Sequence, residues 1–532
     1  MTGTGVTGAG LLLMAPLRLE ARAVAQGAPG ARIVRTGAGP LRSCRSVEEI
    51  TAGVRLHGER RSPYPARGFD PPGAGVTRTN TRAVAVAGLA GGLSDDLEPG
   101  TVVVANRVID ETGNVAAQLS SAPLLAAELT ARGHRALVGT VISARSVVQG
   151  SARRAALASL GAVAVDTETA WLLGNGWGLP SAAVRVIVDT PGRELRSLAT
   201  VTGGIKALGV LSRAASVVAE WADTVDDREI VLASPRSFCA GVERAIETVN
   251  RAIDKFGAPV YVRRHIVHNR HVVADLEARG AVFVSELDEV PDDATVVFSA
   301  HGVAPAVRHR AAERGLRVVD ATCPLVSKVH HEVRRFASRS MQVVLIGHAG
   351  HDETEGTLGE AANISLVENP ADVAHLAVSD PERLAYVTQT TLSPDDVASV
   401  VEELTRLYPG VVGPGSADVC YATQNRQDAV RMIAPRCAVV IVVGSPTSSN
   451  ANRLVEVARR SGSKAVLVED ERDLRFEHVR GASVLGVTAA ASTPPHVVDA
   501  VVDALSAFGP TNITEVSTVA ENASFSLPVE VR

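Results

Sequence analysis

Composition and charge limit the classes of protein to which this chain belongs. It has 532 residues, of which 46% are hydrophobic and 21% are charged, so we expect a globular protein of two to four domains. The net charge of −5 provides no basic field for nucleic acid. The longest apolar runs, such as "AVVIVVG" from Ala438, have the length of a strand, which argues against a membrane span.

Cysteine usage points to a reducing compartment. Five scattered cysteines in so long a chain do not form the disulfide framework of a secreted protein. Near the start, "GLLLMAPL" lacks a basic leader and an extended apolar stretch, so we interpret it as a first strand and not as a signal peptide. The predicted location is the cytoplasm.

Strand-like and helix-like segments alternate along almost the whole chain. The strand-like runs are rich in Val and Ile, in chain order "AVAVAGLAGG", "TVVVANRVI", "EIVLA", "TVVFSAHG", "RVVDATCP", "QVVLIGHAGH" and "AVVIVVGS". Continuous apolar runs of this kind are typical of parallel strands that helices cover on both faces. The predicted fold class is therefore α/β, with chemistry expected in loops at the carboxyl ends of the strands.

A domain boundary is predicted near residue 225. There "SVVAEWADTVDDRE" has the pattern of a final helix followed by an acidic linker, and "EIVLA" then starts a new strand. All but two of the 14 histidines and all but one of the cysteines follow this point. We therefore predict a first domain over 1–222 and a second over 229–532.

The first domain resembles the nucleoside phosphorylase and nucleosidase superfamily. The resemblance rests on "MAPLRLEARAV", "RTGAGP", "VAVAGLAGGLSDDLEPGTVVVANRVID", "SLGAVAVDTETAWLL" and "AVRVIVDTPG". It implies that Asp189 protonates a purine, that Glu168 binds ribose, and that Glu20 activates water. Two departures are that "DTET" lacks the usual methionine and that Leu89 replaces a common serine. Either nucleosidase or phosphorylase activity, or a retained fold that has lost activity, is compatible with this pattern.

Three cysteines of the second domain share one setting. Cys239 in "SFCAGVERA", Cys323 in "ATCPLVSKV" and Cys420 in "DVCYATQNRQ" each stand just before a helix-like stretch. The positive end of a helix dipole favours a thiolate, which is a good metal ligand. The alternative is that all three are small buried hydrophobic residues. Cys437 and Cys44 lack this setting and are interpreted as structural.

The spacing of these cysteines favours an iron–sulfur cluster over zinc. Zinc sites commonly use closely paired cysteines, whereas clusters also take thiolates from dispersed positions, usually four of them. Three thiolates would leave one iron without a protein ligand, and such an open position can bind substrate.

Polar residues gather in loops after the strand-like runs of the same domain. Histidines, hydroxyls and an amide together suit an anionic ligand such as diphosphate. Among them Glu353 is a candidate proton donor. The other candidates are His268, His301, His348, His351, Thr390, Ser448, Ser449, Asn450 and Ser492.

Residues from about 229 to the end resemble the 4-hydroxy-3-methylbut-2-enyl diphosphate reductase family. The matching stretches, in family order, are "RSFCAGVERAI", "YVRRHIVHNRHVV", "FSAHGV", "DATCPLVSKVH", "LIGHAGHDETEGT", "TQTTLS", "CYATQNRQ" and "SSNANRL". The resemblance implies a fold of three α/β units around a central cluster. A departure is Ala490, where the family commonly has glycine, just before Ser492.

The resemblance also implies roles for individual residues. Cys239, Cys323 and Cys420 would hold a [4Fe–4S] cluster. Glu353 would deliver protons, with Thr390 positioning both Glu353 and the substrate hydroxyl. The substrate-binding set would comprise His268, His301, His351, Ser448, Ser449, Asn450 and Ser492.

The implied reaction is the last step of the non-mevalonate pathway of isoprene biosynthesis, an oxidoreductase reaction. The allylic hydroxyl of the diphosphate substrate leaves as water, and isopentenyl and dimethylallyl diphosphate result. Ferredoxin or flavodoxin is the expected electron donor. Two alternatives remain open: an iron–sulfur sensor protein, and a protein whose main activity is that of the first domain.

Overall fold

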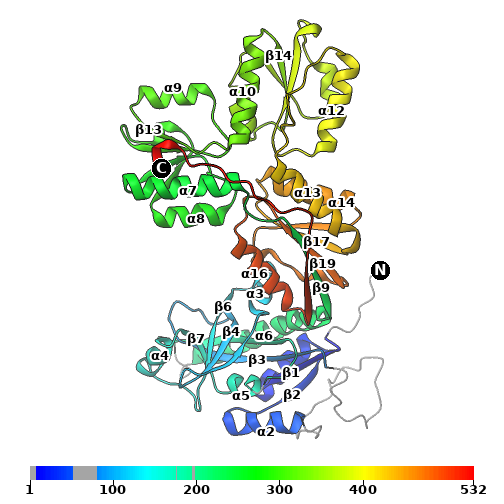
Figure 1. The fold of residues 1–532 in the computed structure, drawn as a ribbon. Helices are drawn as coiled ribbons and strands as arrows, with labels where there is room; N and C mark the ends of the chain where they lie inside the picture. Colours follow the sequence, from blue (N-terminus) through cyan, green and yellow to red (C-terminus); the bar gives the residue numbers. More distant parts are fainter. Residues whose placement is uncertain (1–7, 52–80, 175, 194–197) are drawn as a thin grey trace. The chain divides into compact units, whose positions relative to one another are not determined.

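The computed structural model describes residues 8–51, 81–174, 176–193 and 198–532. They form two compact units (Figure 1). Unit 1 comprises Met1–Glu229 with Glu471–Ser483 and Ala500–Asn512, and unit 2 comprises Ile230–Asp470, Val484–Asp499 and Ile513–Arg532. No helix in the described part of the chain is both long and apolar enough to cross a membrane.

Unit 1 is built on one eight-stranded sheet. Its strands β3, β7, β6, β4 and β8 pair in a closed ring, because β8 pairs with both β3 and β4. The bounds are β1 Leu11–Ala15, β2 Arg32–Arg35, β3 Ala83–Gly92, β4 Val102–Asp110, β5 Val115–Gln118, β6 Ala136–Ser143, β7 Ala162–Asp166 and β8 Ser181–Asp189.

The expectation of parallel strands is only partly right for this sheet. The pairs β1–β3, β3–β8 and β4–β6 are parallel, but β3–β7, β4–β5 and β4–β8 are antiparallel. A closed ring of five strands cannot be antiparallel throughout, so at least one of its pairs has to be parallel. Helices surround the sheet, namely α1 Arg18–Gly27, α2 Pro40–Thr51, α3 Ala122–Ala131, α4 Ser151–Ala158, α5 Thr169–Leu173 and α6 Leu198–Thr224.

Unit 2 contains three separate sheets, in agreement with the predicted three α/β parts. The first sheet has the order β11-β10-β12-β13 and is entirely parallel. Its strands are β10 Val260–Arg263, β11 Ala281–Val284, β12 Thr295–Phe298 and β13 Arg317–Asp320, and its helices are α7 Ala240–Phe256, α8 Arg270–Arg279 and α9 Pro305–Glu313.

The second and third sheets have β14 and β17 near their centres. The second has the order β15-β14-β16, with β14 Gln342–Ile346, β15 Ile364–Val367, β16 Leu384–Thr388, α10 Pro324–Ser338, α11 Asp352–Leu358 and α12 Pro394–Leu407. The third has the order β18-β17-β19-β9-β20, with β9 Arg228–Ser234, β17 Val439–Val443, β18 Lys464–Val468, β19 Val484–Ala489, β20 Thr511–Ser517, α13 Tyr421–Ile433 and α14 Ser449–Arg460. The helix α15 Phe476–Val479 belongs to unit 1, and α16 Pro495–Ser506 begins in unit 2 and ends in unit 1.

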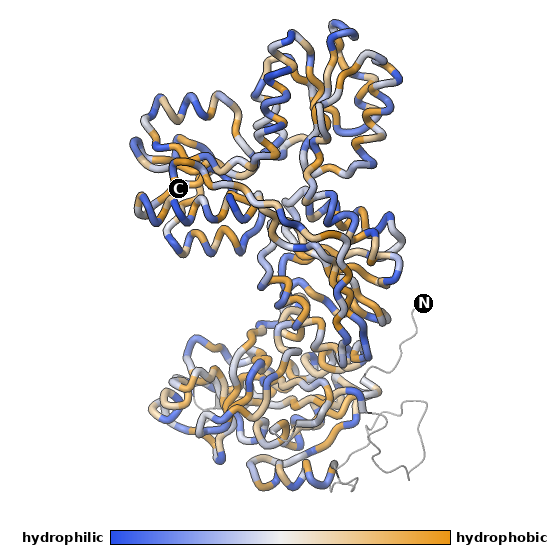
Figure 2. Tube along the Cα trace, in the orientation of Figure 1, coloured by the Kyte–Doolittle hydropathy of each residue, from blue (hydrophilic) through white to orange (hydrophobic). Residues whose placement is uncertain are grey.

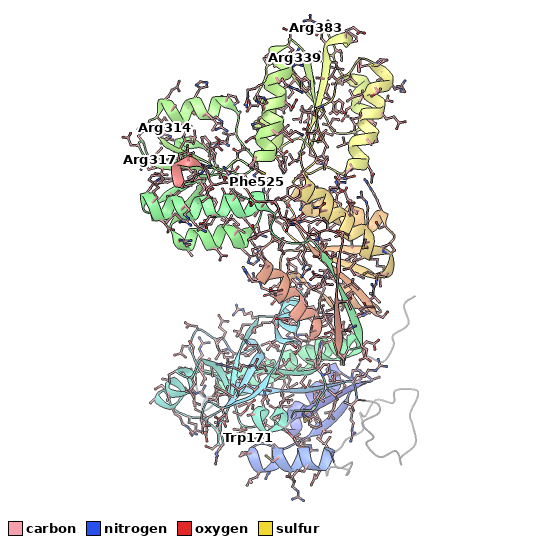
Figure 3. The ribbon with its side chains drawn as sticks, in the orientation of Figure 1. Trp171, Arg314, Arg317, Arg339, Arg383 and Phe525 are labelled. Carbon is pink, nitrogen blue, oxygen red and sulfur yellow. The ribbon has the colours of Figure 1, made fainter. Side chains whose placement is uncertain are left out.

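The apolar strands form the core of each sheet. All five residues of β14 and of β17 are buried, as expected for strands that helices cover on both faces. Figure 2 shows hydrophobic colour along many of the strands, whereas hydrophobic and hydrophilic colours alternate along the helices around them. Figure 3 labels Arg339, which follows α10 and therefore stands at the end opposite to Cys323.

Two late segments of the chain complete unit 1. The indole nitrogen of Trp221, on α6, donates to the carbonyl of Ala507 at 3.3 Å. The guanidinium of Arg228 donates to the carbonyls of Ala482 at 3.1 Å and Phe508 at 2.9 Å. Trp221 is fully buried. The division into domains of 1–222 and 229–532 remains a prediction. A chain cut between these ranges would separate Trp221 from Ala507, its hydrogen-bond partner in unit 1.

Replacing Trp221 with alanine tests this packing. The change removes a fully buried indole and the hydrogen bond to Ala507, so we expect a loss of about 3–5 kcal/mol in the free energy of unfolding of unit 1. Equilibrium urea unfolding followed by circular dichroism measures it. Trp171→Ala is the matched control, since Trp171 on α5 is only half-buried (Figure 3). Equal losses in the free energy of unfolding for both variants would contradict the inference that the buried packing of Trp221 stabilises unit 1.

Candidate functional site

A pocket of about 110 Å³ lies within unit 2. Its lining includes every residue to which the family resemblance assigned a metal-binding, substrate-binding or catalytic role in this part of the chain. These residues are Cys239, His268, His301, Cys323, His351, Glu353, Thr390, Cys420, Ser448, Ser449, Asn450 and Ser492.

The pocket exists because the carboxyl ends of many strands face it. His301 follows β12, Cys323 follows β13, Thr390 follows β16 and Ser492 follows β19, each within a few residues. Parallel strands place such ends at one edge of a sheet, and unit 2 brings edges from all three sheets to one place.

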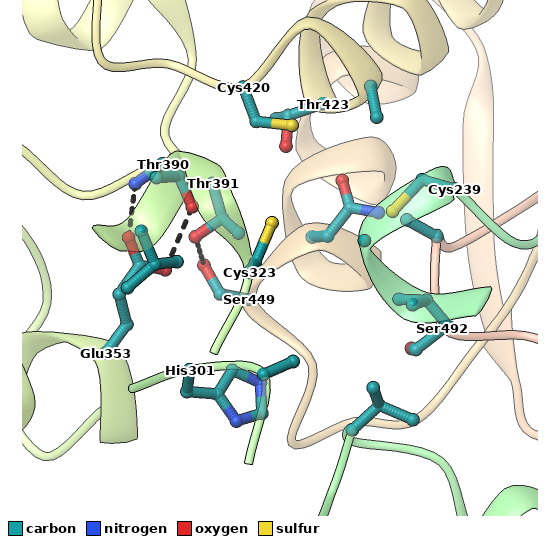
Figure 4. A pocket seen from close by; sticks show the side chains of 18 of the residues that line it. Cys239, His301, Cys323, Glu353, Thr390, Thr391, Cys420, Thr423, Ser449 and Ser492 are labelled. Carbon is teal, nitrogen blue, oxygen red and sulfur yellow. Dashed lines mark hydrogen bonds between the residues drawn. The ribbon is translucent and has the colours of Figure 1, made fainter. Parts of the chain in front are cut away.

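The three cysteines occupy equivalent positions. Cys239, Cys323 and Cys420 are the N-cap residues of α7, α10 and α13. Figure 4 shows their sulfur atoms directed toward one space. A methyl group at Gly241 would lie 2.8 Å from Sγ of Cys323 and 3.8 Å from Sγ of Cys239, so only glycine leaves the space between these sulfurs open.

The expectation that helix ends favour the thiolates holds only in part. Burial raises the pKa of Cys323 to about 12 and that of Cys420 to about 11, and repulsion from Cys239 adds to both shifts. Backbone N–H groups at the starts of α10 and α13 lower these pKa values but do not overcome burial. Three thiolates in this space therefore require a compensating cationic group, which suits metal binding.

The loop that carries Cys239 is held by a buried arginine that the sequence analysis did not identify. Arg426, on α13, donates to the carbonyls of Ser237 at 2.7 Å and Phe238 at 3.1 Å. It also pairs with Glu521 at 3.0 Å. Ser237 has a φ of 63°, so its left-handed backbone depends on such support. Arg426 stands in the recognised stretch "CYATQNRQ", which was a usable signal.

The sequence predicted that Glu353 lies in a loop, but it lies in the first turn of α11. Its side chain is buried and accepts hydrogen bonds from Thr390, at 2.7 Å from the backbone N–H and 3.0 Å from the hydroxyl (Figure 4). Burial raises the pKa of Glu353 to about 7, against the lowering effect of both hydrogen bonds. The carboxyl group can therefore hold a proton at neutral pH and release it.

Three histidines from three loops meet at the pocket. The rings of His268 and His301 stack with centroids 4.4 Å apart, and His351 lies 5.3 Å from the first and 5.6 Å from the second. Burial lowers the pKa of all three, that of His351 to about 4. Nδ1 of His351 accepts from the N–H of Glu353 at 3.2 Å, so the ring carries its proton on Nε2.

Several polar atoms around the pocket have no hydrogen-bond partner within the described residues. They include both amide atoms of Asn450, both ring nitrogens of His268 and Nδ1 of His301. Buried polar groups are normally paired, so such a concentration indicates a polar ligand. The hydroxyls of the set are partly engaged: Ser492 donates to the carbonyl of His268 at 3.2 Å, and Ser448 caps α14.

One further residue of the pocket lining, Thr391, and one residue beside the pocket, Asp352, were not predicted from the sequence. Thr391 lies 3.0 Å from Ser449, hydroxyl to hydroxyl (Figure 4), and its place beside Thr390 in "TQTTLS" was the available signal. Asp352 lies 4.0 Å from His268 and 3.9 Å from His301, and it binds Arg264. These donor atoms of His268, His301 and Asp352 are close enough together to hold a metal ion as well.

The remaining predicted residues lie elsewhere. His348 faces a neighbouring hollow and contacts Arg453 at 3.4 Å. Cys437 is buried in an apolar cluster, as predicted, and the exposure of Cys44 is intermediate. Glu168, Asp189 and Glu20 line a separate cavity of unit 1.

The raised pKa of Glu353 predicts a pH-dependent stability. The folded chain keeps this proton up to about pH 7, whereas an unfolded glutamate releases it near pH 4.5. Stability therefore falls as pH rises between these values, by about 3 kcal/mol in total. Glu353→Gln lacks this titration, so we expect its stability relative to the parent to increase from pH 5 to pH 8.

Urea unfolding at both pH values measures the effect. The control is Glu313→Gln, at an exposed glutamate of α9. A pH dependence that is the same in parent and Glu353→Gln would show that Glu353 has an ordinary pKa.

Comparison with known proteins adds independent findings. The family model described as LytB protein matches residues 230–506, and that described as Phosphorylase superfamily matches residues 74–219. A curated relative from Ectopseudomonas mendocina, named 4-hydroxy-3-methylbut-2-enyl diphosphate reductase, is 56% identical over 308 residues, which cover 57% of this chain and 98% of the relative. One of the same name from Cutibacterium acnes is 54% identical, over 58% of this chain and 95% of the relative.

A solved structure agrees. The E-1-hydroxy-2-methyl-but-2-enyl-4-diphosphate reductase from Plasmodium falciparum is 38% identical, with a TM-score of 0.55, over 57% of this chain and 97% of that protein. Members of the matched family are iron–sulfur oxidoreductases. The chain belongs to the LytB family through residues 230–506, and it carries a phosphorylase-superfamily domain before them.

Proposed function

We propose that unit 2 reductively removes the hydroxyl group of 4-hydroxy-3-methylbut-2-enyl diphosphate and forms isopentenyl and dimethylallyl diphosphate. The observation that carries this proposal is the content of one pocket: three helix-capping thiols, a buried carboxyl group with a pKa of about 7, and unpaired polar donors. The names of the curated relatives support the same reaction.

Cys239, Cys323 and Cys420 would hold a [4Fe–4S] cluster. The donor set fits, because Gly241 keeps the space between two of the sulfurs free and burial makes uncompensated thiolates unfavourable. A three-cysteine set also matches a cluster with one iron left for a non-protein ligand. When bound, the cluster supplies the electrons that reductive dehydroxylation consumes.

The diphosphate would bind where the unpaired polar atoms gather. His268, His301 and Asn450 offer buried donors, and the N-terminus of α14 adds backbone N–H groups near Ser448 and Ser449. The imidazoles are held neutral by burial, and an adjacent anion would raise their pKa values and draw protons onto them. Such pairing offsets the cost of burying a diphosphate.

Glu353 would donate the proton that converts the departing hydroxyl into water. The overall balance is two electrons and two protons consumed, one C–O bond broken, one C–H bond formed and one water released. Thr390 acts as a positioning residue, because its N–H and hydroxyl both fix the carboxyl group of Glu353. The other proton goes to either end of the allyl skeleton, which accounts for two products.

The proposed reaction also requires an electron donor and a reducing compartment. The electrons would come from a one-electron carrier such as ferredoxin or flavodoxin. Because all five cysteines are free thiols and three must remain ligands, we place the protein in the reducing cytoplasm.

Cysteine replacement tests the metal-binding set. We expect Cys239→Ser, Cys323→Ser and Cys420→Ser each to lose the brown colour or to hold a degraded cluster, with turnover lost. Cys437→Ala and Cys44→Ser are the controls, since neither residue lines the pocket. Iron and sulfide content after anaerobic purification, together with the visible spectrum, measure the outcome. Loss of the cluster in Cys437→Ala alongside the other variants would refute the three-ligand assignment.

Glu353→Gln tests the proton donor. The amide keeps the size of the side chain but has no transferable proton, so turnover with a reduced viologen dye should fall by a factor on the order of 10²–10⁴. Iron content and substrate binding should remain. Near-parental turnover would remove Glu353 from the mechanism. No turnover of the diphosphate by the parent chain, with its cluster intact, would favour the sensor alternative.

A further inference from the structure

Each helix that a pocket cysteine caps also carries a cationic side chain in its second turn. The pairs are Cys239 and Arg244 on α7, Cys323 and Lys328 on α10, and Cys420 and Arg426 on α13. These three described cations lie outside the lining of the pocket. Their role therefore depends on the groups that they contact elsewhere.

The cation of α7 contacts the loop of the next cysteine along the chain. Nη1 of Arg244 donates to the carbonyls of Ala321 and Thr322, both at 3.1 Å. These are the two residues directly before Cys323. Nε of Arg244 donates to the carbonyl of Ser526 at 2.7 Å, which fixes the guanidinium group further. Helix α7 is thereby joined to the loop that presents Cys323.

The cation of α10 contacts the loop of the third cysteine in the same way. Nζ of Lys328 donates to the carbonyls of Ser416 and Ala417, both at 2.8 Å. It also lies 3.1 Å from Oδ1 of Asp418, whose side chain is fully buried. A charged partner stabilises a buried carboxylate, so this ion pair holds the ammonium group against the loop. The loop leads directly into Cys420.

The cation of α13 contacts the loop of the first cysteine and so closes a cycle. Arg426 donates to the carbonyls of Ser237 and Phe238, the two residues directly before Cys239. The other two contacts run forward along the chain, whereas this one runs back over 189 residues from Arg426 to Ser237. Each of the three helices therefore holds the loop that presents the cysteine of another helix.

The clamped groups suggest what the three cations do. A loop that is held at the carbonyls just before a cysteine also holds the direction of the thiol. Contacts that orient metal ligands in this way commonly account for about 10–100-fold of metal affinity or activity. A cation beside each loop also opposes the negative charge that three thiolates bring together.

We propose that Arg244, Lys328 and Arg426 form a closed cycle of clamps that positions the three cysteines for the cluster before it binds. The inference rests on the proposed function of unit 2, because it takes these cysteines as the cluster ligands. The three cations are positioning residues, since they act through the loops and not on the substrate. Removing one clamp should therefore loosen the cysteine of the neighbouring helix and not the cysteine of its own helix.

Alkylation of the cluster-free full chain with iodoacetamide tests this order. A partly buried thiol reacts faster when its loop opens to solvent, so the rate at each cysteine reports the opening of its loop. We expect Arg244→Met to raise the rate at Cys323 by about 10-fold, because two hydrogen bonds to that loop are lost. The rates at Cys239 and Cys420 should change by less than about 2-fold. Mass spectrometry of the peptides measures each rate.

Lys328→Met tests the second clamp, and we expect its about 10-fold effect at Cys420. The matched control is Lys255→Met, because Lys255 also lies on α7 and donates to a carbonyl, that of Glu530 at 2.7 Å. This carbonyl is far along the chain from all three cysteines, so the control should leave their rates within about 2-fold of the parent. Cys44 in unit 1 serves as an internal reference for folding.

Two results of the alkylation experiment would overturn the proposal. One is that Arg244→Met accelerates Cys239, on its own helix, as much as Cys323. The other is that the three thiols of the parent react as fast as those of the urea-unfolded chain, because clamped loops must be held without the cluster.

Retention of the cluster provides a second readout and a rescue. After anaerobic reconstitution, decay of the brown absorbance in the presence of a chelator should be about 10–100-fold faster in Arg244→Met and Lys328→Met than in the parent. Arg244→Lys and Lys328→Arg keep a cationic donor near the same carbonyls, so decay should return to within about 3-fold of the parent. Conservative variants that decay as fast as the methionine variants would show that the charge and its donors have no such role.

The choice of Arg244 and Lys328 avoids a folding defect. Both are only partly buried, whereas Arg426 is fully buried and pairs with Glu521, so its removal would leave a carboxylate unpaired. Circular dichroism checks the fold of each variant.

The outcomes separate this inference from the proposed function. A parent chain that holds its cluster but does not reduce the diphosphate would refute the reaction, and the alkylation pattern would still decide whether the clamps exist. A parent chain that reduces the diphosphate while Arg244→Met and Lys255→Met show the same alkylation rates would refute the clamps and leave the reaction standing.

Discussion

The compensation of buried charge is the constraint on which both units of this chain depend. In unit 2, burial raises the pKa of Cys323 and Cys420 and lowers that of His301, so each group is held away from its charged form. These groups nevertheless converge on one pocket together with unpaired amide and imidazole atoms. The uncharged forms make this pocket tolerable, and the proposed metal cluster and diphosphate would supply the opposite charges that thiolates and imidazolium groups need.

In unit 1 the buried charges are compensated by side chains of the same unit. Arg154 and Arg185 are buried, and they pair with Asp189 and with Asp166 and Glu168, respectively. Each of these two arginines is paired with a carboxylate, whereas several polar atoms at the pocket of unit 2 have no hydrogen-bond partner within the described residues.

Glu353 illustrates how position determines chemistry. Most glutamates are exposed and ionised. This one is buried, and Thr390 donates two hydrogen bonds to it. Burial raises the pKa of Glu353 by more than these hydrogen bonds lower it, so the carboxyl group retains a proton near neutral pH. The hydrogen bonds keep its orientation fixed. The same side chain in a solvated loop would have neither property.

The sequence by itself determined the α/β class, the order of most strands and helices, and most of the polar residues that line the pocket of unit 2. Those conclusions depend on local signals: continuous apolar runs, a cysteine before each of three helices, and short polar motifs at strand ends. The tertiary structure decided what depends on distant parts of the chain. The antiparallel pairs β3–β7 and β4–β8, the support of the Cys239 loop by Arg426, and the pairing of Arg154 with Asp189 join residues far apart in sequence. The pKa values of Cys323 and Glu353 belong to this second group, because desolvation is set by everything that packs around a side chain and no local pattern records it.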